Sequence, residues 1–160
     1  MLLSFVVGHE VCLATLCSTL DVLGLLEVFR RMVNESIRIG IANDVSSLRR
    51  LSLLSYNQLA QYDSPSCHKL CAISRAAGIL ASRKKSLRRG FPTRMPYAVR
   101  PHLISCYSFK TKNGQLEIPI GRGKRLSIPL TKHTLKVISQ PGVTVRSLHP
   151  VRSTFSFRSP

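Results

Sequence analysis

The hydrophobic periodicity of this chain changes at Gly90, and that change restricts it to folds that combine helices with a separate β region. Before Gly90 the apolar residues recur at helical spacing. After Gly90, short runs of alternating apolar and polar residues are separated by turn residues, a pattern typical of antiparallel strands. The sequence therefore predicts an α+β fold in which helices precede most of the strands.

A short apolar strand is expected at Leu2–Val7, and the helical part follows within residues 11–90. The first helix is expected to begin near Ser18 and to end at an Asn43-Asp44 turn. Its apolar stripe should face the core and runs through Leu20, Leu23, Val28 (or Leu26 and Glu27 beside it), Arg31, Ile37 and Ile41.

Two further helices are predicted from their end signals. Ser46 or Ser47 can cap the second, and Ser64 with Pro65 fits the start of the third. The third should end at Gly90-Phe91-Pro92, because glycine and proline both stop helices. The positions expected to face the core are Leu48, Leu51, Tyr56 and Leu59 in the second helix, and Leu70, Ile73, Ala77, Leu80 and Leu87 in the third.

Residues 91–160 are predicted to form a small antiparallel β-barrel or half-barrel after a proline-rich extended linker. Asn113-Gly114 is a strong hairpin signal, and Gly121–Lys124 makes a second turn. The strands expected around these turns are His102–Lys110, Gln115–Ile120, and a third through Leu126, Ile128 and Leu130; a short helix at Thr131–Ser139 and strands at Val143–Leu148 and Arg152–Phe157 follow.

Charge is divided unevenly along the chain. Residues 1–63 hold five arginines and six acids, whereas residues 64–160 hold nineteen basic residues and a single acid, Glu117. A soluble surface normally intersperses acids among its bases. Their absence here makes a polyanion the natural partner, with nucleic acid favoured over an anionic membrane. RNA and DNA are therefore the expected partners.

The densest basic signal lies on the predicted third helix, where the bases are suited to contact a phosphate backbone. The Gly121–Arg125 turn lacks the context of a nucleotide-binding loop, so it is either a basic hairpin tip that contacts phosphates or a turn that merely needs glycine. The candidate nucleic-acid-binding residues are Arg75, Arg83, Lys84, Lys85, Arg88, Arg89, Arg100, Arg122, Lys124 and Arg125.

No catalytic, metal or cofactor site is predicted. Cys67 and Cys71 lie four residues apart, but no second pair completes the four ligands of a structural zinc site. The carboxylates are too scattered for acid–base chemistry. A Cys106 nucleophile with His102 or His133 stays open as an alternative. The five cysteines and the absence of an uninterrupted apolar span favour a reduced, cytoplasmic protein outside the membrane.

Several motifs, taken in order, resemble the N-terminal half of the OrfB/TnpB proteins of small transposons, particularly archaeal ones. The matching stretches are Phe29–Asn34, Ile39–Ile41, Ala72–Ser86, Pro96-Tyr97, Arg100–Ile104, Leu116–Gly121, Leu126–Leu130 and Val145–Ser147. That family comprises RNA-guided DNA nucleases related to type V CRISPR effectors, in which base pairing carries the sequence specificity and the protein reads backbone and shape.

The resemblance implies a helical recognition-type lobe (residues 11–90) inserted after a first strand (residues 1–10), then a wedge-like β-barrel (residues 91–160). These parts would hold guide RNA and heteroduplex. The family's RNase-H-like nuclease domain, with its Asp, Glu, Asp metal site and zinc ribbon, follows the wedge domain and is not in this sequence. A truncated copy that binds but does not cut is therefore expected, with a separately encoded nuclease half as one conceivable partner. A free-standing RNA-binding module and a non-functional transposon remnant are the alternatives.

Overall fold

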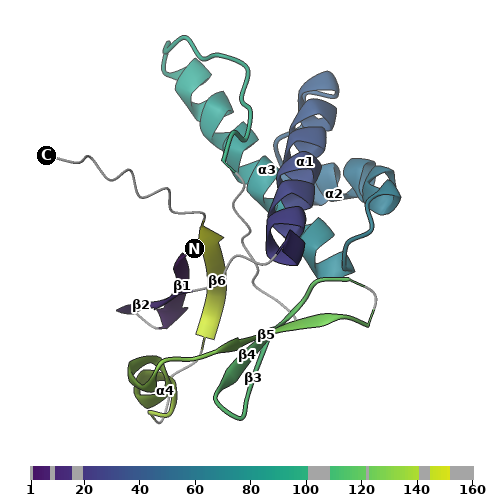
Figure 1. Ribbon diagram of the computed structural model, residues 1–160. Coiled ribbons are helices and arrows are strands. Elements are labelled where there is room, and N and C mark those ends of the chain that lie inside the picture. The colour runs from purple at the N-terminus through teal and green to yellow at the C-terminus, as the bar shows by residue number, and fades with distance from the viewer. Residues whose placement is uncertain are drawn as a thin grey trace, which may run out of the picture.

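A computed structural model describes residues 2–7, 10–15, 20–100, 109–121, 123–140 and 145–151. Three α-helices form the larger part of it: α1 (Leu20–Ala42), α2 (Leu48–Ser55) and α3 (Ser66–Arg88), with a short 3-10 helix, η1 (Gln58–Gln61), before α3. Helix α1 packs along α3, and α2 contacts both (Figure 1). The predicted helical region is therefore confirmed.

The helical core forms where α1, α2 and α3 meet. Phe29 and Met32 of α1, Leu51 of α2, Leu59 of η1 and Ile73 of α3 are fully buried. Ala72 and Ala76 are also fully buried, and their small side chains allow α1 to approach α3 closely. Of the positions predicted to face the core, the structure buries Ile37, Leu51, Leu59, Ile73, Ala77 and Leu80.

Other predicted core positions are wrong. Leu48, Tyr56, Leu70 and Leu87 are exposed. Leu87 fails because α1 is too short to reach it: α1 ends at Ala42, and Asp44 beyond it already lies beside Lys84 of α3. The last turn of α3 therefore extends past its neighbour. Leu23, Val28 and Ile41 are only half-buried, and the side chain of Leu20 lies outside the described part.

Both long helices end as their sequences predict. Gly90 takes a φ of +79° and donates to the carbonyl of Leu87 (3.0 Å), while Phe91 donates to Ser86 (3.1 Å). This pair of hydrogen bonds is the Schellman motif, which needs a residue with left-handed backbone conformation after the last helical turn. Asp44, with a φ of 49°, does the same for α1 within the predicted turn. Helix α3 begins at Ser66 after Pro65, one residue later than its cap signal indicates.

The strands described form two open three-stranded antiparallel sheets. One contains β1 (Leu2–Val7), β2 (Glu10–Thr15) and β6 (Val145–Val151) in the order β2-β1-β6, and the other contains β3 (Lys110–Lys112), β4 (Gln115–Pro119) and β5 (Arg125–Pro129) in chain order. The antiparallel β region is therefore confirmed, but the described strands form open sheets and no closed barrel. Strand β3 exposes all three of its residues and presents two lysines, which blunts this edge against further pairing.

Strand β1 pairs with β6, so the chain returns to its first sheet after the helices. In the chain, the three helices therefore lie between strands of one sheet. Strand β2, however, was expected to belong to the helical part, and it instead forms a hairpin with β1. Pro150 of β6 pairs with Leu3, and a proline is tolerated in β6 because one side of an edge strand makes no hydrogen bonds within the sheet.

The second sheet follows its predicted pattern. Asn113 and Gly114 both have positive φ, as a two-residue hairpin turn requires. Leu116, Ile118 and Ile128 are buried at alternating positions. Helix α4 (Lys132–Ile138) confirms the short helix and is capped by Thr131, whose Oγ1 accepts the amide hydrogen of Thr134 (3.2 Å). The predicted strands His102–Lys110 and Arg152–Phe157 lie mainly or wholly outside the described residues.

His68 joins the helices to the second sheet. It is fully buried on α3, and its Nε2 lies 2.8 Å from the carbonyl oxygen of Pro119 at the end of β4. Ile120 and Leu126, which flank the β4–β5 turn, also pack against the helical core. The first turns of α3 therefore lie at this sheet, and the basic end of α3 points away from it (Figure 1).

After α3 the chain runs back along the helices as an extended segment, residues 91–100, and α1 holds it there. The side-chain amide of Asn34 donates to the carbonyl of Ala98 (3.1 Å), and its oxygen accepts the amide hydrogen of Ala98 (2.7 Å). Two bonds to one residue reproduce the pairing of a β ladder, and they fix the segment against the helix.

Replacing Asn34 by alanine will release this segment. The substitution removes both hydrogen bonds between the Asn34 side chain and the backbone N–H and C=O groups of Ala98. We expect faster trypsin cleavage after Arg94, measured by mass spectrometry of the first fragments. Cleavage after Arg50 in α2 serves as the internal control and should not change. An unchanged rate after Arg94 would show that other contacts hold the segment.

Candidate nucleic-acid interface

The arginines of α1 are matched by acids on the same helix. Arg30 and Arg31 both bond to Glu27, and the bond from Arg30 lowers the pKa of Glu27 to about 2. The bond from Arg38 likewise lowers the pKa of Glu35 below its ordinary value. Because each of these carboxylates stays ionised beside its arginines, α1 contributes little net positive field.

The outer side of α3 is different. Arg75, Lys85, Arg88 and Arg89 are exposed, and none of them has an ion-pair partner among the residues that the structure describes. Lys85 and Arg88 also lie in the last turn of α3, where the helix dipole favours cations. Lys85, Arg88 and Arg89 form an uncompensated basic surface at the C-terminal end of the helix, and Arg75 lies nearer its middle.

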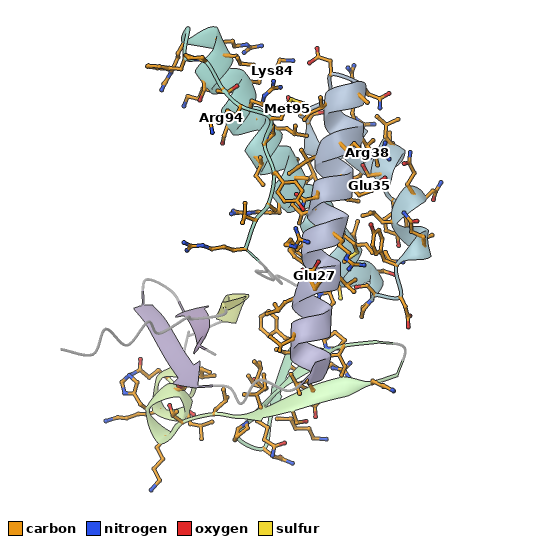
Figure 2. The ribbon with its side chains drawn as sticks, turned by 45° about the horizontal axis from the view of Figure 1, so that its top comes forward. Glu27, Glu35, Arg38, Lys84, Arg94 and Met95 are labelled. Carbon is orange, nitrogen blue, oxygen red and sulfur yellow. The ribbon has the colours of Figure 1, made fainter. Side chains whose placement is uncertain are left out.

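Arg83 and Lys84 lie elsewhere on the helix. Arg83 is half-buried, and its Nη2 contacts the sulfur of Met95 in the extended segment at 3.8 Å. Lys84 forms a long ion pair with Asp44 at the end of α1, 3.9 Å between Nζ and Oδ2, with both side chains largely in solvent. Figure 2 labels Lys84, Arg94 and Met95 at this end of the helices, with Glu35 and Arg38 further down α1. Exposed pairs of this kind are weak, so Lys84 remains available to a stronger anion.

The second predicted group, at the β4–β5 turn, lies far from the first. Lys124 is exposed, Arg125 lies 3.8 Å from Glu117, and Arg122 lies outside the described residues. The turn packs beside the start of α3, near His68, and Arg88 is at the other end of the helix. With a rise of ~1.5 Å per residue, roughly 30 Å separates these two ends. The predicted residues are therefore not brought together at one site.

Arg100 extends the first group instead. It is exposed at the end of the returning segment, and Arg94 is exposed within it. Arg94 is absent from the sequence-based candidates, although Arg100 of the same proline-rich linker is among them. A signal in the sequence could have identified Arg94: it lies with Arg100 in a short segment that also holds Phe91, Met95, Tyr97 and Val99, all of them exposed. We call Arg75, Lys85, Arg88, Arg89, Arg94 and Arg100 the basic band.

Tyr97 links this segment to α1. Its hydroxyl accepts a hydrogen bond of 2.6 Å from Nη1 of Arg30, whose guanidinium carbon lies 5.6 Å from the centroid of the tyrosine ring. A guanidinium near a ring face is attracted by the ring quadrupole. Arg30 thus holds Glu27 and Tyr97 at once, and the ring has a defined position on the surface.

The described residues contain no group of three or more His, Cys, Asp or Glu side chains that could hold a metal ion. His133 is exposed on α4, and its suggested partner Cys106 lies outside the described part. No described helix combines the length and apolar character needed to cross a bilayer.

Comparisons with protein-family models, with curated proteins and with solved structures found no match to this chain.

Proposed function

We propose that this protein binds nucleic acid through the basic band, mainly by contacts to the phosphate backbone. The observation that carries the proposal is the contrast between the two long helices. Each arginine of α1 is paired with Glu27 or Glu35, whereas Arg75, Lys85, Arg88 and Arg89 have no ion-pair partner among the described residues. Cations left unpaired at a helix end gain most from an anionic partner, because counterions are released on binding.

A matched pair of triple variants tests the proposal. Lys85→Gln, Arg88→Gln and Arg89→Gln remove three charges from the band. Arg38→Gln, Arg49→Gln and Arg50→Gln remove three charges from α1 and α2, and glutamine preserves helix propensity in both cases. The probe is a fluorescein-labelled RNA hairpin, or a DNA duplex of equal length, followed by anisotropy across a salt series.

The unmodified chain should bind both probes with strong salt dependence. The band variant should weaken binding on the order of tenfold or more at low salt, and each lost contact should reduce the salt slope by about 1. The control variant should change both quantities much less. Equal effects of the two variants would point to diffuse attraction by net charge, and absence of binding at low salt would refute the proposal.

We further propose that the chain is a relative of the guide-RNA-holding part of OrfB/TnpB proteins, a binding rather than a cutting part. The ordered motifs support this, and so does the pairing of β1 with β6 across the helices, which fits the implied insertion after a first strand. Sequencing of the RNA that co-purifies with the protein tests this relationship. An RNA from a transposon end supports it, whereas bulk ribosomal RNA favours a free-standing RNA-binding module.

A further inference from the structure

The segment between α3 and β3 exposes large apolar side chains that phosphate contacts do not explain. Phe91, Met95, Tyr97 and Val99 are 62%, 64%, 62% and 74% exposed. From Met95 onward these residues alternate with the half-buried Pro96 and Ala98, as in an extended chain that turns one face outward. A cluster of exposed apolar residues of this size marks a surface that a ligand covers.

The two aromatic residues stand at positions that are fixed before any ligand arrives. Phe91 is held by its backbone bond to Ser86, which closes α3. Tyr97 is held through its hydroxyl by Arg30, and its neighbour Ala98 is held by Asn34. Because the backbone around both rings is already ordered, a ligand that contacts them loses little conformational entropy in ordering it.

The charges around these rings select the kind of ligand. Arg88, Arg89, Arg94 and Arg100 are exposed beside or between the aromatic residues, and the sequence holds no acid from Ser64 to Leu116. A ligand for this surface must therefore combine regularly spaced anions with flat apolar groups. A duplex keeps its bases stacked inside, whereas a single strand offers both phosphates and free base faces.

We infer that residues 91–100 bind a single-stranded nucleic acid, with unpaired bases stacked on Phe91 and Tyr97 and phosphates against the neighbouring arginines. The inference rests on the proposed function and makes it more specific. About six extended residues separate the two rings, or roughly 20 Å, so the rings contact different bases of one strand. Backbone contacts by the rest of the band then add affinity without any preference for sequence.

The experiment uses the whole chain and two probes, each measured over the same salt series: an unstructured oligouridine, and a duplex of equal length. The double variant Phe91→Leu, Tyr97→Leu removes both rings without a change in charge. Tyr97→Phe keeps the ring and loses only the hydroxyl. Tyr56→Leu, which removes an exposed ring from the end of α2, is the matched control. Thermal unfolding of each variant verifies that it is folded.

We expect the double variant to bind oligouridine roughly tenfold or more weakly, because a stacked base contributes about 1–3 kcal/mol by such substitutions. Its duplex affinity and its salt slope should stay the same. Tyr56→Leu should bind like the unmodified chain, whereas Tyr97→Phe, which keeps the ring but loses its hydrogen bond from Arg30, should bind oligouridine more tightly than the double variant does. Photocrosslinking of 4-thiouridine RNA should yield adducts at Phe91 or Tyr97, a result that general loss of stability cannot imitate.

If the double variant binds oligouridine as tightly as the unmodified chain does, the inference that bases stack on Phe91 and Tyr97 is wrong. Binding that still weakens with added salt would leave the proposed function intact. If neither probe binds the unmodified chain, the proposed function fails first. If an acidic peptide with aromatic residues binds through Phe91 and Tyr97 while oligouridine does not, the surface is a protein-binding one and the inference is wrong.

Discussion

Replacing Phe29 by alanine will lower the free energy of unfolding by about 3–5 kcal/mol. Phe29 is among the largest fully buried side chains and lies on the face of α1 that packs in the helical core. Its removal loses the free energy gained by burying the phenyl ring away from water, and it leaves a cavity that the surrounding side chains fill only in part. Against a domain stability of ~5–15 kcal/mol, this is a large fraction.

Urea denaturation followed by circular dichroism measures the effect of Phe29→Ala. The urea concentration at which half of the protein is unfolded should fall. The slope of the unfolding free energy against urea concentration should stay the same, which indicates a change in stability and not in the compactness of the denatured state. Leu53→Ala is the control: Leu53 is 77% exposed on α2, and its loss should change stability by less than about 0.5 kcal/mol. Equal losses in the two variants would contradict the core described above.

Gly40→Val is the second change with a large expected effect. A Cβ atom at Gly40 would lie 2.3 Å from Leu80 Cδ1 and 2.9 Å from the carbonyl oxygen of Val45. The leucine can rotate, but the carbonyl belongs to the turn that closes α1, whose amide bonds back to Gly40 (2.8 Å). The turn must therefore shift, and overpacking of this kind costs about 1–3 kcal/mol, with valine at the upper end.

The same substitution at Gly78 provides the control. Gly78 lies within α3, and an added Cβ there meets no atom within 4 Å. Since valine is no worse than glycine in a helix, Gly78→Val should leave thermal stability unchanged or raise it slightly. If both variants melt together, the close contact of α1 with α3 at Gly40 is not as the structure describes it.

Features encoded by neighbouring residues were predictable from the sequence. The hairpin at Asn113-Gly114, the end of α3 at Gly90 and the alternation of Leu116 with Ile118 all depend on backbone preferences or on a local period. Each of these needs only a few adjacent residues. The sequence therefore located most elements after residue 17 without knowledge of their neighbours.

Features that depend on which elements meet were not predictable in the same way. The small residues Ala72 and Ala76 escaped the core prediction because periodicity weighs large side chains, whereas close helix packing selects small ones. Leu87 was misassigned because nothing in α3 itself reveals where α1 ends. Strand β2 and the open form of the sheets were missed for the same reason, because strand pairing depends on which segments meet in the folded chain.

The candidate site shows the same division. The sequence drew attention to the bases of α3, but it did not reveal that Arg83 turns toward Met95 or that the β4–β5 turn lies at the opposite end of the helix. Nor did it identify residues 91–100 as a docked segment, because its anchors, Arg30 and Asn34, lie more than sixty residues earlier.

The pairing of β1 with β6 has a consequence for the order in which the chain folds. The three helices and the β3–β5 sheet are built largely from contacts between elements near in sequence, whereas the first sheet needs Val145–Val151 to reach Leu2–Val7. Closing an unstructured loop of that length costs about 4 kcal/mol in chain entropy, and prior folding of the helices shortens the effective loop. During synthesis on the ribosome, β1 can therefore pair only with β2, and its other edge stays unpaired until β6, at the end of the described chain, has been made.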